Sequence, residues 1–245
     1  FMLVYIKKKK LFAFKLSSFD KADIWLLIQK AVPSVVQQSI PAISTTFLTA
    51  LVSTYSITAI AAYGVTGKLE IILFYPAMAL NMVLTTIIGQ CAGGNRYDRA
   101  RDYLKCGLKY GCGLLVILSV LVVGFSRQLS GLFVRSDEVA EIVGTYFLIV
   151  GIGYILNTVT NCYLGSLNGL GKPSKSMFLM IFYYIIVRMP LAYLLSHLNL
   201  GLNGIWFAVL VSHVVASIAA ALTGTVYLKK GWKGTKEGNL ISSEM

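Results

Sequence analysis

Charged residues are scarce in this 245-residue sequence: they make up 13% of it, whereas hydrophobic residues make up 56%. A soluble domain has about 25% charged residues, so this composition excludes most soluble folds. Intrinsic disorder is excluded as well, because disordered chains are highly charged and poor in aromatic residues. This chain has 14 tyrosines, 12 phenylalanines and three tryptophans. The sequence therefore predicts an integral membrane protein.

Long stretches of the sequence contain no Asp, Glu, Lys or Arg. They cover residues 31–67, 71–95, 110–126, 142–171 and 189–228. Apolar stretches of about 18 or more residues are typical of membrane-spanning helices, because a helix rises about 1.5 Å per residue and the hydrocarbon core is about 30 Å thick. Barrel strands would instead alternate polar and apolar residues over about ten residues. We therefore predict an all-α integral membrane fold with six transmembrane helices, near residues 26–53, 62–90, 108–126, 140–168, 174–196 and 204–228.

The two ends of the sequence differ from this central region. Residues 1–6 are apolar and residues 7–10 are all lysine, which is the reverse of the order in a secretory signal peptide. We expect residues 1–23 to hold the end of a preceding membrane helix and a cytoplasmic linker between two lobes. Residues 24–230 are expected to form the six-span lobe, and residues 231–245 a cytoplasmic tail. On this interpretation the chain is the C-terminal part of a longer protein.

Basic residues outnumber acidic residues by 22 to 10. Most of them lie in residues 7–30, 96–109, 172–175 and 229–236, which are alternate connections of the six-span arrangement. Loops rich in Lys and Arg face the cytoplasm, so both ends of the chain are predicted to be cytoplasmic. The basic loops can contact anionic membrane lipid. A nucleic-acid partner is not expected, because the sequence has no soluble basic platform with stacking aromatic residues.

Short glycine-rich motifs follow the second and fourth predicted spans. Residues 89–101 read GQCAGGNRYDRAR, and residues 165–176 read GSLNGLGKPSKS. Together with AIAAYGVTGKLE at residues 59–70 and RMPLAYLL at residues 188–195, they resemble the multidrug and toxic compound extrusion (MATE) family. The resemblance implies twelve spans in two lobes around a central cavity, with this chain as the C-terminal lobe. It also implies a bacterial efflux transporter of the plasma (inner) membrane, not an enzyme. Such a transporter exchanges amphipathic, often cationic, drug-like small molecules for H⁺ or Na⁺.

This sequence departs from one branch of that family in its carboxylates. Sodium-type members carry an Asp eight residues before the glycine that corresponds to Gly165, where this sequence has Asn157. They also carry a Glu in the first span of this lobe, but no carboxylate lies between Asp23 and Glu70. The resemblance therefore places the site of the coupling ion in the N-terminal lobe. No metal or other cofactor is expected in this chain, and its binding surfaces are expected to lack a central acid.

Polar side chains share one face of the first predicted span. Gln38, Pro41 and Thr45 are separated by three and four residues, a spacing that places them on one side of a helix, with Gln37 alongside. Pro33 and Pro41 free backbone carbonyls from their helical partners, so we predict a bend at these prolines. The two adjacent amides favour the wall of a substrate pathway. The alternative is helix packing through small and hydroxylated residues.

Amides also recur in the fourth and second predicted spans. Asn157 and Asn161 are one helical turn apart, and Tyr154 joins the same face. Because an amide in lipid without a partner costs several kcal/mol, this face must look toward protein or water. We predict that Asn157 and Asn161 line the substrate pathway, together with Asn81 of the second span. Ordinary core packing is the alternative for Asn81.

Two charged residues interrupt predicted spans. Arg188 lies in the fifth span with Tyr184 one turn earlier. A charge in hydrocarbon costs about 2.5–3.5 kcal/mol, so such residues face a cavity or a partner. Both residues are predicted to line the substrate pathway, although an arginine can also extend toward the membrane surface. Glu70 is expected near the outer end of the second span, paired with Arg127 or Arg135 in a solvated cluster.

Motifs of several other functions are absent. The four cysteines have no C-x-x-C spacing, which argues against a disulfide framework and a zinc site. No catalytic triad, H-E-x-x-H motif or phosphate-binding loop is present, so enzymatic activity is not predicted. Two alternatives to efflux stay open. One is a lipid-linked oligosaccharide flippase of the same superfamily, which would need more basic residues in its cavity; the other is a membrane scaffold without transport activity.

Overall fold

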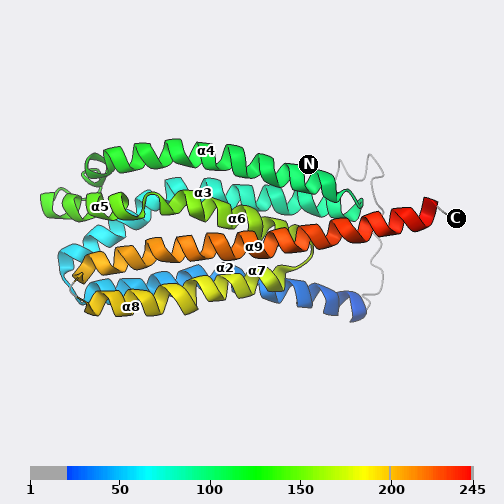
Figure 1. Ribbon diagram of the computed structural model, residues 1–245. Coiled ribbons are helices and arrows are strands. Elements are labelled where there is room, and N and C mark those ends of the chain that lie inside the picture. The colour runs from blue at the N-terminus through cyan, green and yellow to red at the C-terminus, as the bar shows by residue number, and fades with distance from the viewer. Residues whose placement is uncertain (1–20, 199, 244–245) are drawn as a thin grey trace, which may run out of the picture.

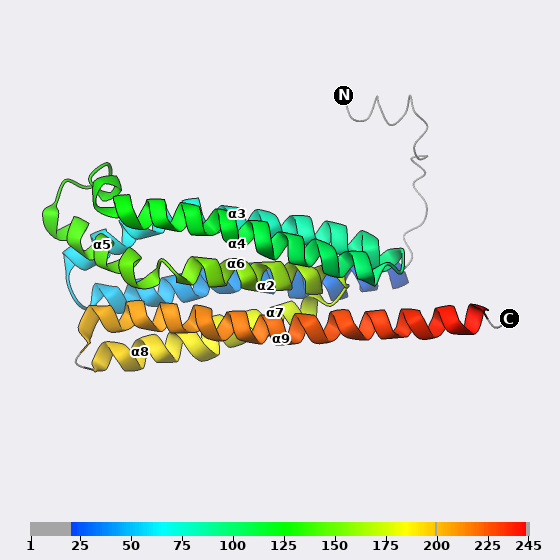
Figure 2. The same cartoon turned by 45° about the horizontal axis from the view of Figure 1, so that its top comes forward.

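The computed structural model describes the backbone of residues 21–198 and 200–243, with side chains as far as residue 229. Every element assigned in these residues is helical. In chain order they are α2 (Lys21–Ser53), α3 (Ile57–Gly93), α4 (Tyr97–Ser130), α5 (Asp137–Val150), α6 (Gly153–Gly169), α7 (Pro173–Ile181), the π-helix η1 (Phe182–Arg188), α8 (Met189–His197) and α9 (Gly201–Ser243). Most of them run along one common axis (Figures 1 and 2).

The helices account for six apolar spans. Five helical segments are long and apolar enough to cross a membrane, and one of them is α7, η1 and α8 taken together. A sixth span is the pair α5–α6, which is bent by 52° at a short break. The predicted all-helical membrane fold is therefore confirmed. The sequence did not reveal the bend or the π-helical turns.

The third span begins earlier than predicted. We predicted residues 96–109 as a basic connection ahead of the third span, but nearly all of them form the first turns of α4, which begins at Tyr97. A tight turn precedes it, in which Asn95 adopts a positive φ of 54° and the Arg96 N–H donates to the Cys91 carbonyl at 2.8 Å. Asparagine tolerates this left-handed conformation better than most residues. The basic residues of α4 are therefore held on a helix that continues into the membrane.

The two predicted terminal segments have different outcomes. Residues 1–20, which hold most of the expected linker, lie outside the described residues, and residues 21–23 already belong to α2. At the other end, α9 continues as a helix to Ser243, through most of the segment predicted as a tail. No proline follows Pro190 to interrupt that helix.

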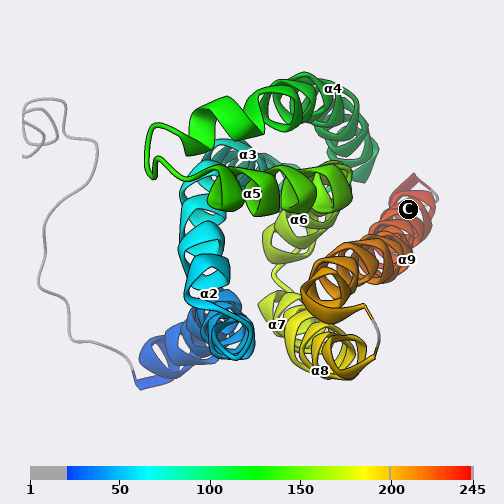
Figure 3. The ribbon, with the colours of Figure 1, turned by 90° about the vertical axis from the view of Figure 1, so that its left-hand side faces the viewer.

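α6 packs closely against α3 near the centre of the bundle (Figure 3). A Cβ atom added at Gly165 would lie 2.5 Å from the carbonyl oxygen of Asn81, and one at Gly169 would lie 2.7 Å from that of Thr85. The two glycines therefore let the backbones of α3 and α6 touch, as small residues do in membrane bundles. The Thr85 hydroxyl donates to the Gly165 carbonyl at 3.2 Å. This contact brings Asn81 beside the amides of α6.

A buried aromatic cluster fixes the end of α5. Trp206 of α9 is fully buried, stacks on Tyr63 with ring centroids 5.7 Å apart, and meets Tyr146 edge-on at 4.8 Å. The bend between α5 and α6 follows at Gly151, whose carbonyl accepts a hydrogen bond of 2.7 Å from Ser119. The cluster and the bend together set the directions in which the side chains of α5 and α6 point.

Candidate functional site

Two adjoining cavities lie between α2, α3, α6 and η1. The first has a volume of about 150 Å³ and is called the amide cavity, because its lining includes Gln37, Gln38, Asn81, Asn157 and Asn161. The second has a volume of about 320 Å³ and is called the charged cavity, because Glu70 and Arg188 line it. The two cavities share Pro41, Phe74 and Tyr184.

Every residue that we predicted to line a substrate pathway borders one of these cavities. The amide cavity is lined by Gln37, Gln38, Asn81, Asn157, Asn161 and Tyr184. The charged cavity is lined by Thr45 and Arg188, and again by Tyr184. Of the two prolines predicted to bend the first span, Pro41 lines both cavities and Pro33 neither, and α2 continues as a helix through both. Passage of a substrate past these residues, and bending at the prolines, remain predictions.

A hydrogen-bonded chain of amides crosses the amide cavity. The Asn81 side-chain NH₂ donates to the Asn161 side-chain oxygen at 3.4 Å. Asn161 in turn donates to the backbone and side-chain oxygens of Asn157 at 3.0 and 3.3 Å. Helical spacing places Asn157 and Asn161 together on α6, whereas Asn81 reaches them only because α3 and α6 touch. The chain links the two helices inside the lobe.

Two amide atoms of this cavity have no hydrogen-bond partner. They are Oε1 of Gln37 and Nδ2 of Asn157, and both are buried. Gln37 is 6% exposed and Asn157 is 2% exposed. An unsatisfied buried polar atom costs about 1–3 kcal/mol, so native proteins keep few of them. Gln37 and Asn157, which both line the amide cavity, therefore each keep one buried amide atom without a hydrogen-bond partner.

Replacing Gln37 with methionine is expected to raise the melting temperature of the substrate-free protein by about 3–8 °C, because it removes an unsatisfied acceptor at nearly constant volume. Thermal unfolding in detergent measures this change. Gln38→Met is the matched control: Gln38 is the exposed neighbour, and its replacement should shift the melting temperature by less than about 2 °C. An equal or lower melting temperature for Gln37→Met would show that water already satisfies Oε1.

Arg188 is directed into the lobe and is 8% exposed. Its Nε donates to Ser212 at 2.9 Å and its Nη2 donates to the Tyr183 hydroxyl at 2.5 Å. Its guanidinium carbon lies 4.7 and 4.6 Å from the ring centroids of Tyr183 and Tyr184. His213 is 3.3 Å from Nη2. Arg188 is thus anchored inside the bundle, and the alternative of extension to the membrane surface is wrong.

Glu70 also faces the charged cavity. Its Oε1 accepts hydrogen bonds from the hydroxyls of Tyr146 and Tyr154, which lie on α5 and α6 on the two sides of the bend. Its second oxygen, Oε2, makes no hydrogen bond with any described residue. Charge-assisted hydrogen bonds from two buried phenols hold the carboxylate in place and leave one oxygen available to a ligand.

The predicted pairing of Glu70 with Arg127 or Arg135 is wrong. Among residues 21–198 and 200–229, the ion pair that the structure shows is Lys105–Asp102 at 3.7 Å, and Arg127 instead packs against Gly144. We did not expect an acid in a cavity of this lobe, but Glu70 lines the charged cavity. A signal was present in the sequence: Glu70 is a lone carboxylate between two long apolar stretches. An ionisable residue at membrane depth is by default a candidate functional residue.

The arrangement suits binding of a guest molecule between helices. It combines one fixed carboxylate, one fixed guanidinium, unused amide groups and aromatic walls inside an apolar bundle. No group of three or more His, Cys, Asp or Glu residues that could hold a metal ion occurs within the described part of the chain. Membrane-spanning helices around polar internal cavities define the class of a multi-pass membrane transport protein.

Comparison with known families agrees with this class. The family model described as MatE matches residues 33–194. The chain belongs to the MatE family, whose members are transporters and not enzymes. The resemblance predicted from the glycine-rich motifs is therefore confirmed.

Curated relatives give the degree of similarity. The chain is 29% identical over 150 residues to the probable multidrug resistance protein NorM of Pasteurella multocida, a match that covers 59% of this chain and 32% of the relative. It is 26% identical over 152 residues to a protein named FAD transporter of Shewanella oneidensis, covering 62% and 33%. The matched region thus spans about a third of these relatives, both of which are bacterial.

Solved structures share the fold. The crystal structure of the Vibrio cholerae MATE transporter VcmN in the bent form superposes with a TM-score of 0.85 at 20% sequence identity. The crystal structure of MATE in complex with MaL6 gives a TM-score of 0.86 at 18% identity. Both matches cover 94% of this chain and 52% of the solved chain. The chain therefore has the fold of about half of a MATE transporter.

Proposed function

We propose that this chain is the C-terminal lobe of a secondary-active efflux transporter in the bacterial plasma membrane, with both ends of the chain in the cytoplasm. The transporter would export amphipathic, often cationic, organic compounds in exchange for H⁺ or Na⁺. Two lobes of such a transporter rock about a shared pathway and open it alternately to each side. The amide and charged cavities would form this lobe's half of that pathway.

The observation that carries this proposal is the available carboxylate oxygen of Glu70 in the charged cavity. An organic cation placed there gains a charge-assisted contact in surroundings of low dielectric constant. The rings of Tyr63 and Tyr184 line the same cavity, and aromatic faces attract cations. Met78 and Met82 line the adjoining amide cavity, and flexible thioethers adapt to guests of different shape. The relatives named for multidrug resistance support the same substrate class.

The coupling ion is proposed to bind in the other lobe. Because the position of Asn157 holds an amide, the amide cavity has no carboxylate. A side-chain amide neither gains nor loses a proton at ordinary pH. H⁺ and Na⁺ both fit this proposal.

A second candidate substrate is an anionic aromatic dinucleotide. One relative is named FAD transporter, and the guanidinium of Arg188 lines the charged cavity. This guanidinium and the ring of Tyr184 could hold a phosphate and a flavin. If FAD is the substrate, Arg188→Gln should abolish its export while Glu70→Gln leaves it intact. The flippase alternative finds less support, because Arg188 is the one Lys or Arg in the lining of either cavity.

The double variant Gln38→Leu with Asn157→Leu tests whether the cavities carry a substrate. Because it removes two polar groups from the amide cavity, it is expected to lower efflux of an organic cation such as ethidium at least about tenfold. Dye efflux and growth inhibition in cells expressing the full coding sequence measure the effect. Membrane insertion should be unchanged.

The matched control changes two polar residues outside the cavities. Ser39→Leu with Thr86→Leu alters exposed positions of α2 and α3, so efflux should stay within about twofold of the unmodified protein. A scaffold would tolerate both double variants. Equal efflux in the two would therefore contradict the proposed transport function.

A further inference from the structure

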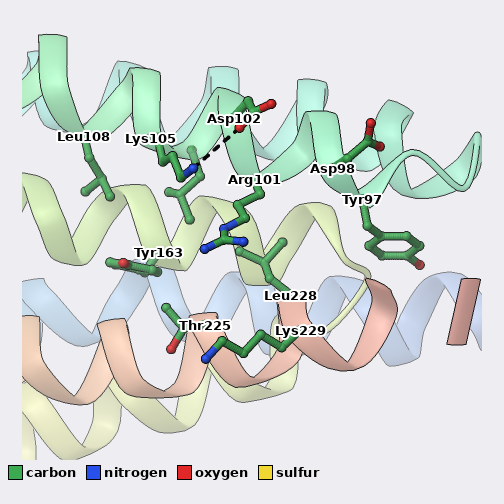
Figure 4. A pocket seen from close by; sticks show the side chains of 11 residues that line it. Tyr97, Asp98, Arg101, Asp102, Lys105, Leu108, Tyr163, Thr225, Leu228 and Lys229 are labelled. Atoms are coloured by element: carbon green, nitrogen blue, oxygen red, sulfur yellow. Dashed lines mark ion pairs between the residues drawn. The ribbon is translucent and has the colours of Figure 1, made fainter. Parts of the chain in front are cut away.

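A groove on the outside of the bundle, between the first turns of α4 and the α9 segment 225–229, is separate from the two cavities. It has a volume of about 310 Å³ and shares no lining residue with either cavity. Figure 4 shows Arg101 reaching from α4 toward α9, where Lys229 extends along the helix near Thr225. We call it the α4–α9 groove.

The floor of the groove is apolar and aromatic. Leu104 and Leu108 come from α4, Leu228 from α9 and Tyr163 from α6. A Cβ atom added at Gly224 would lie 2.5 Å from a ring carbon of Tyr163, so that glycine lets the ring lie directly on the backbone of α9. The groove therefore has a closed back that acyl chains can contact.

The rim of the groove carries three cationic and two acidic side chains, and two of the cations form no ion pair with any described residue. Lys105 forms an exposed ion pair with Asp102 at 3.7 Å, but Arg101 and Lys229 form no ion pair with any described residue. Asp98 also lines the groove. The two unpaired cations come from different helices, α4 and α9, and both line the groove.

Along the helix axes, the groove lies at the level expected for a lipid headgroup. The charge-free stretch of α4 begins just after Lys109, and that of α9 ends just before Lys229. Basic residues that follow an apolar helical stretch lie at the membrane surface, as do tyrosines such as Tyr97 and Tyr163 of this groove. Basic pockets between transmembrane helices on the cytoplasmic side bind anionic lipid headgroups.

We propose that the α4–α9 groove binds an anionic phospholipid, with its phosphate between Arg101 and Lys229 and an acyl chain on the leucines and Tyr163. Arg101 suits this role because its planar guanidinium can donate two parallel hydrogen bonds to a phosphate. The site does not depend on the proposed transport function, since the groove shares no residue with the cavities. Loss of either property therefore leaves the other measurable.

Native mass spectrometry of the full chain, with phosphatidylglycerol and phosphatidylcholine offered at equal concentration, tests the site. The unmodified protein should retain phosphatidylglycerol in preference. Arg101→Gln with Lys229→Gln is expected to weaken that binding about twenty-fold, since each basic residue near an anionic surface contributes about fivefold. Both side chains are exposed, so the fold should be unaffected, and helical content by circular dichroism checks this.

The control removes the same number of charges from the same end of the bundle. Lys172→Gln with Lys175→Gln changes exposed residues outside the groove and should leave the preference within about twofold. An equal loss in this control would overturn the site in favour of general attraction to the membrane. Soluble glycerol phosphate should not displace the lipid at a hundredfold excess. Displacement would show that the groove binds a free phosphate ester and would contradict the proposal that its ligand is a phospholipid.

Discussion

Glu70→Gln should lower export of a monovalent organic cation about ten- to hundredfold. Hydrogen bonds and contacts to a charged group contribute about 1.5–3 kcal/mol, and the substitution removes the charge while it keeps the size of the side chain. The hydroxyls of Tyr146 and Tyr154 can still donate to the amide oxygen, so the fold should be retained. Initial rates of ethidium export from cells expressing the full coding sequence measure the effect.

Two comparisons make the Glu70 result specific. Glu141→Gln removes an exposed carboxylate of α5 that lines neither cavity, and it should leave export within about twofold. A neutral substrate of similar size should be exported by the Glu70→Gln variant at close to the normal rate. Unchanged export of the cation, with the variant inserted in the membrane at the usual level, would show that Glu70 has no role in substrate binding.

Gly165→Ala is expected to lower the melting temperature of the protein by about 4–10 °C. The added methyl group would lie 2.5 Å from the Asn81 carbonyl oxygen and 3.0 Å from its Cα, and backbone atoms cannot rotate out of the way. Overpacking of this kind costs about 1–3 kcal/mol, and a change of 1 kcal/mol shifts the melting temperature of a domain of this size by about 2–4 °C. Thermal unfolding in detergent checks the shift.

Gly113→Ala is the matched control for the effect of a methyl group on a helix. Nothing lies within 4 Å of the Cβ position at Gly113 of α4, so its replacement should raise the melting temperature slightly, through the better helix propensity of alanine. If Gly165→Ala lowered the melting temperature by less than about 4 °C, or raised it, α3 and α6 would be able to move apart without a cost in stability. Because Asn81 meets Asn161 across this contact, the Gly165 variant should also lose efflux.

The polar faces of single helices were predictable from spacing alone. Gln38, Pro41 and Thr45 recur at helical intervals, and so do Asn157 and Asn161, so each set had to share a face whatever the helices packed against. All of them border the cavities. The partners on other helices were not predictable, because helix spacing carries no information about which neighbour a face meets.

Glu70 illustrates that difference. Tyr146 and Tyr154 lie 76 and 84 residues away in the sequence. They belong to the two sides of a span that is bent by 52°, and both donate to the same carboxylate oxygen. Helical spacing could predict that Tyr146 and Tyr154 lie on neighbouring faces of one span, but not which side chain of another helix they would meet. The predicted pairing of Glu70 with Arg127 or Arg135 was wrong because it had to be guessed without this information.

The sequence by itself determined that the chain is an all-helical membrane protein, which side chains share each face, and the family to which it belongs. The hydrocarbon core imposes helical structure on each apolar segment, because every backbone donor must be satisfied within that segment. The tertiary structure alone decided the hydrogen-bond partners of Glu70 and Arg188, the contact of α3 with α6 through Gly165, and the α4–α9 groove. These features arise where helices meet, and helix packing in lipid depends on small residues and bends whose partners lie far away in the chain.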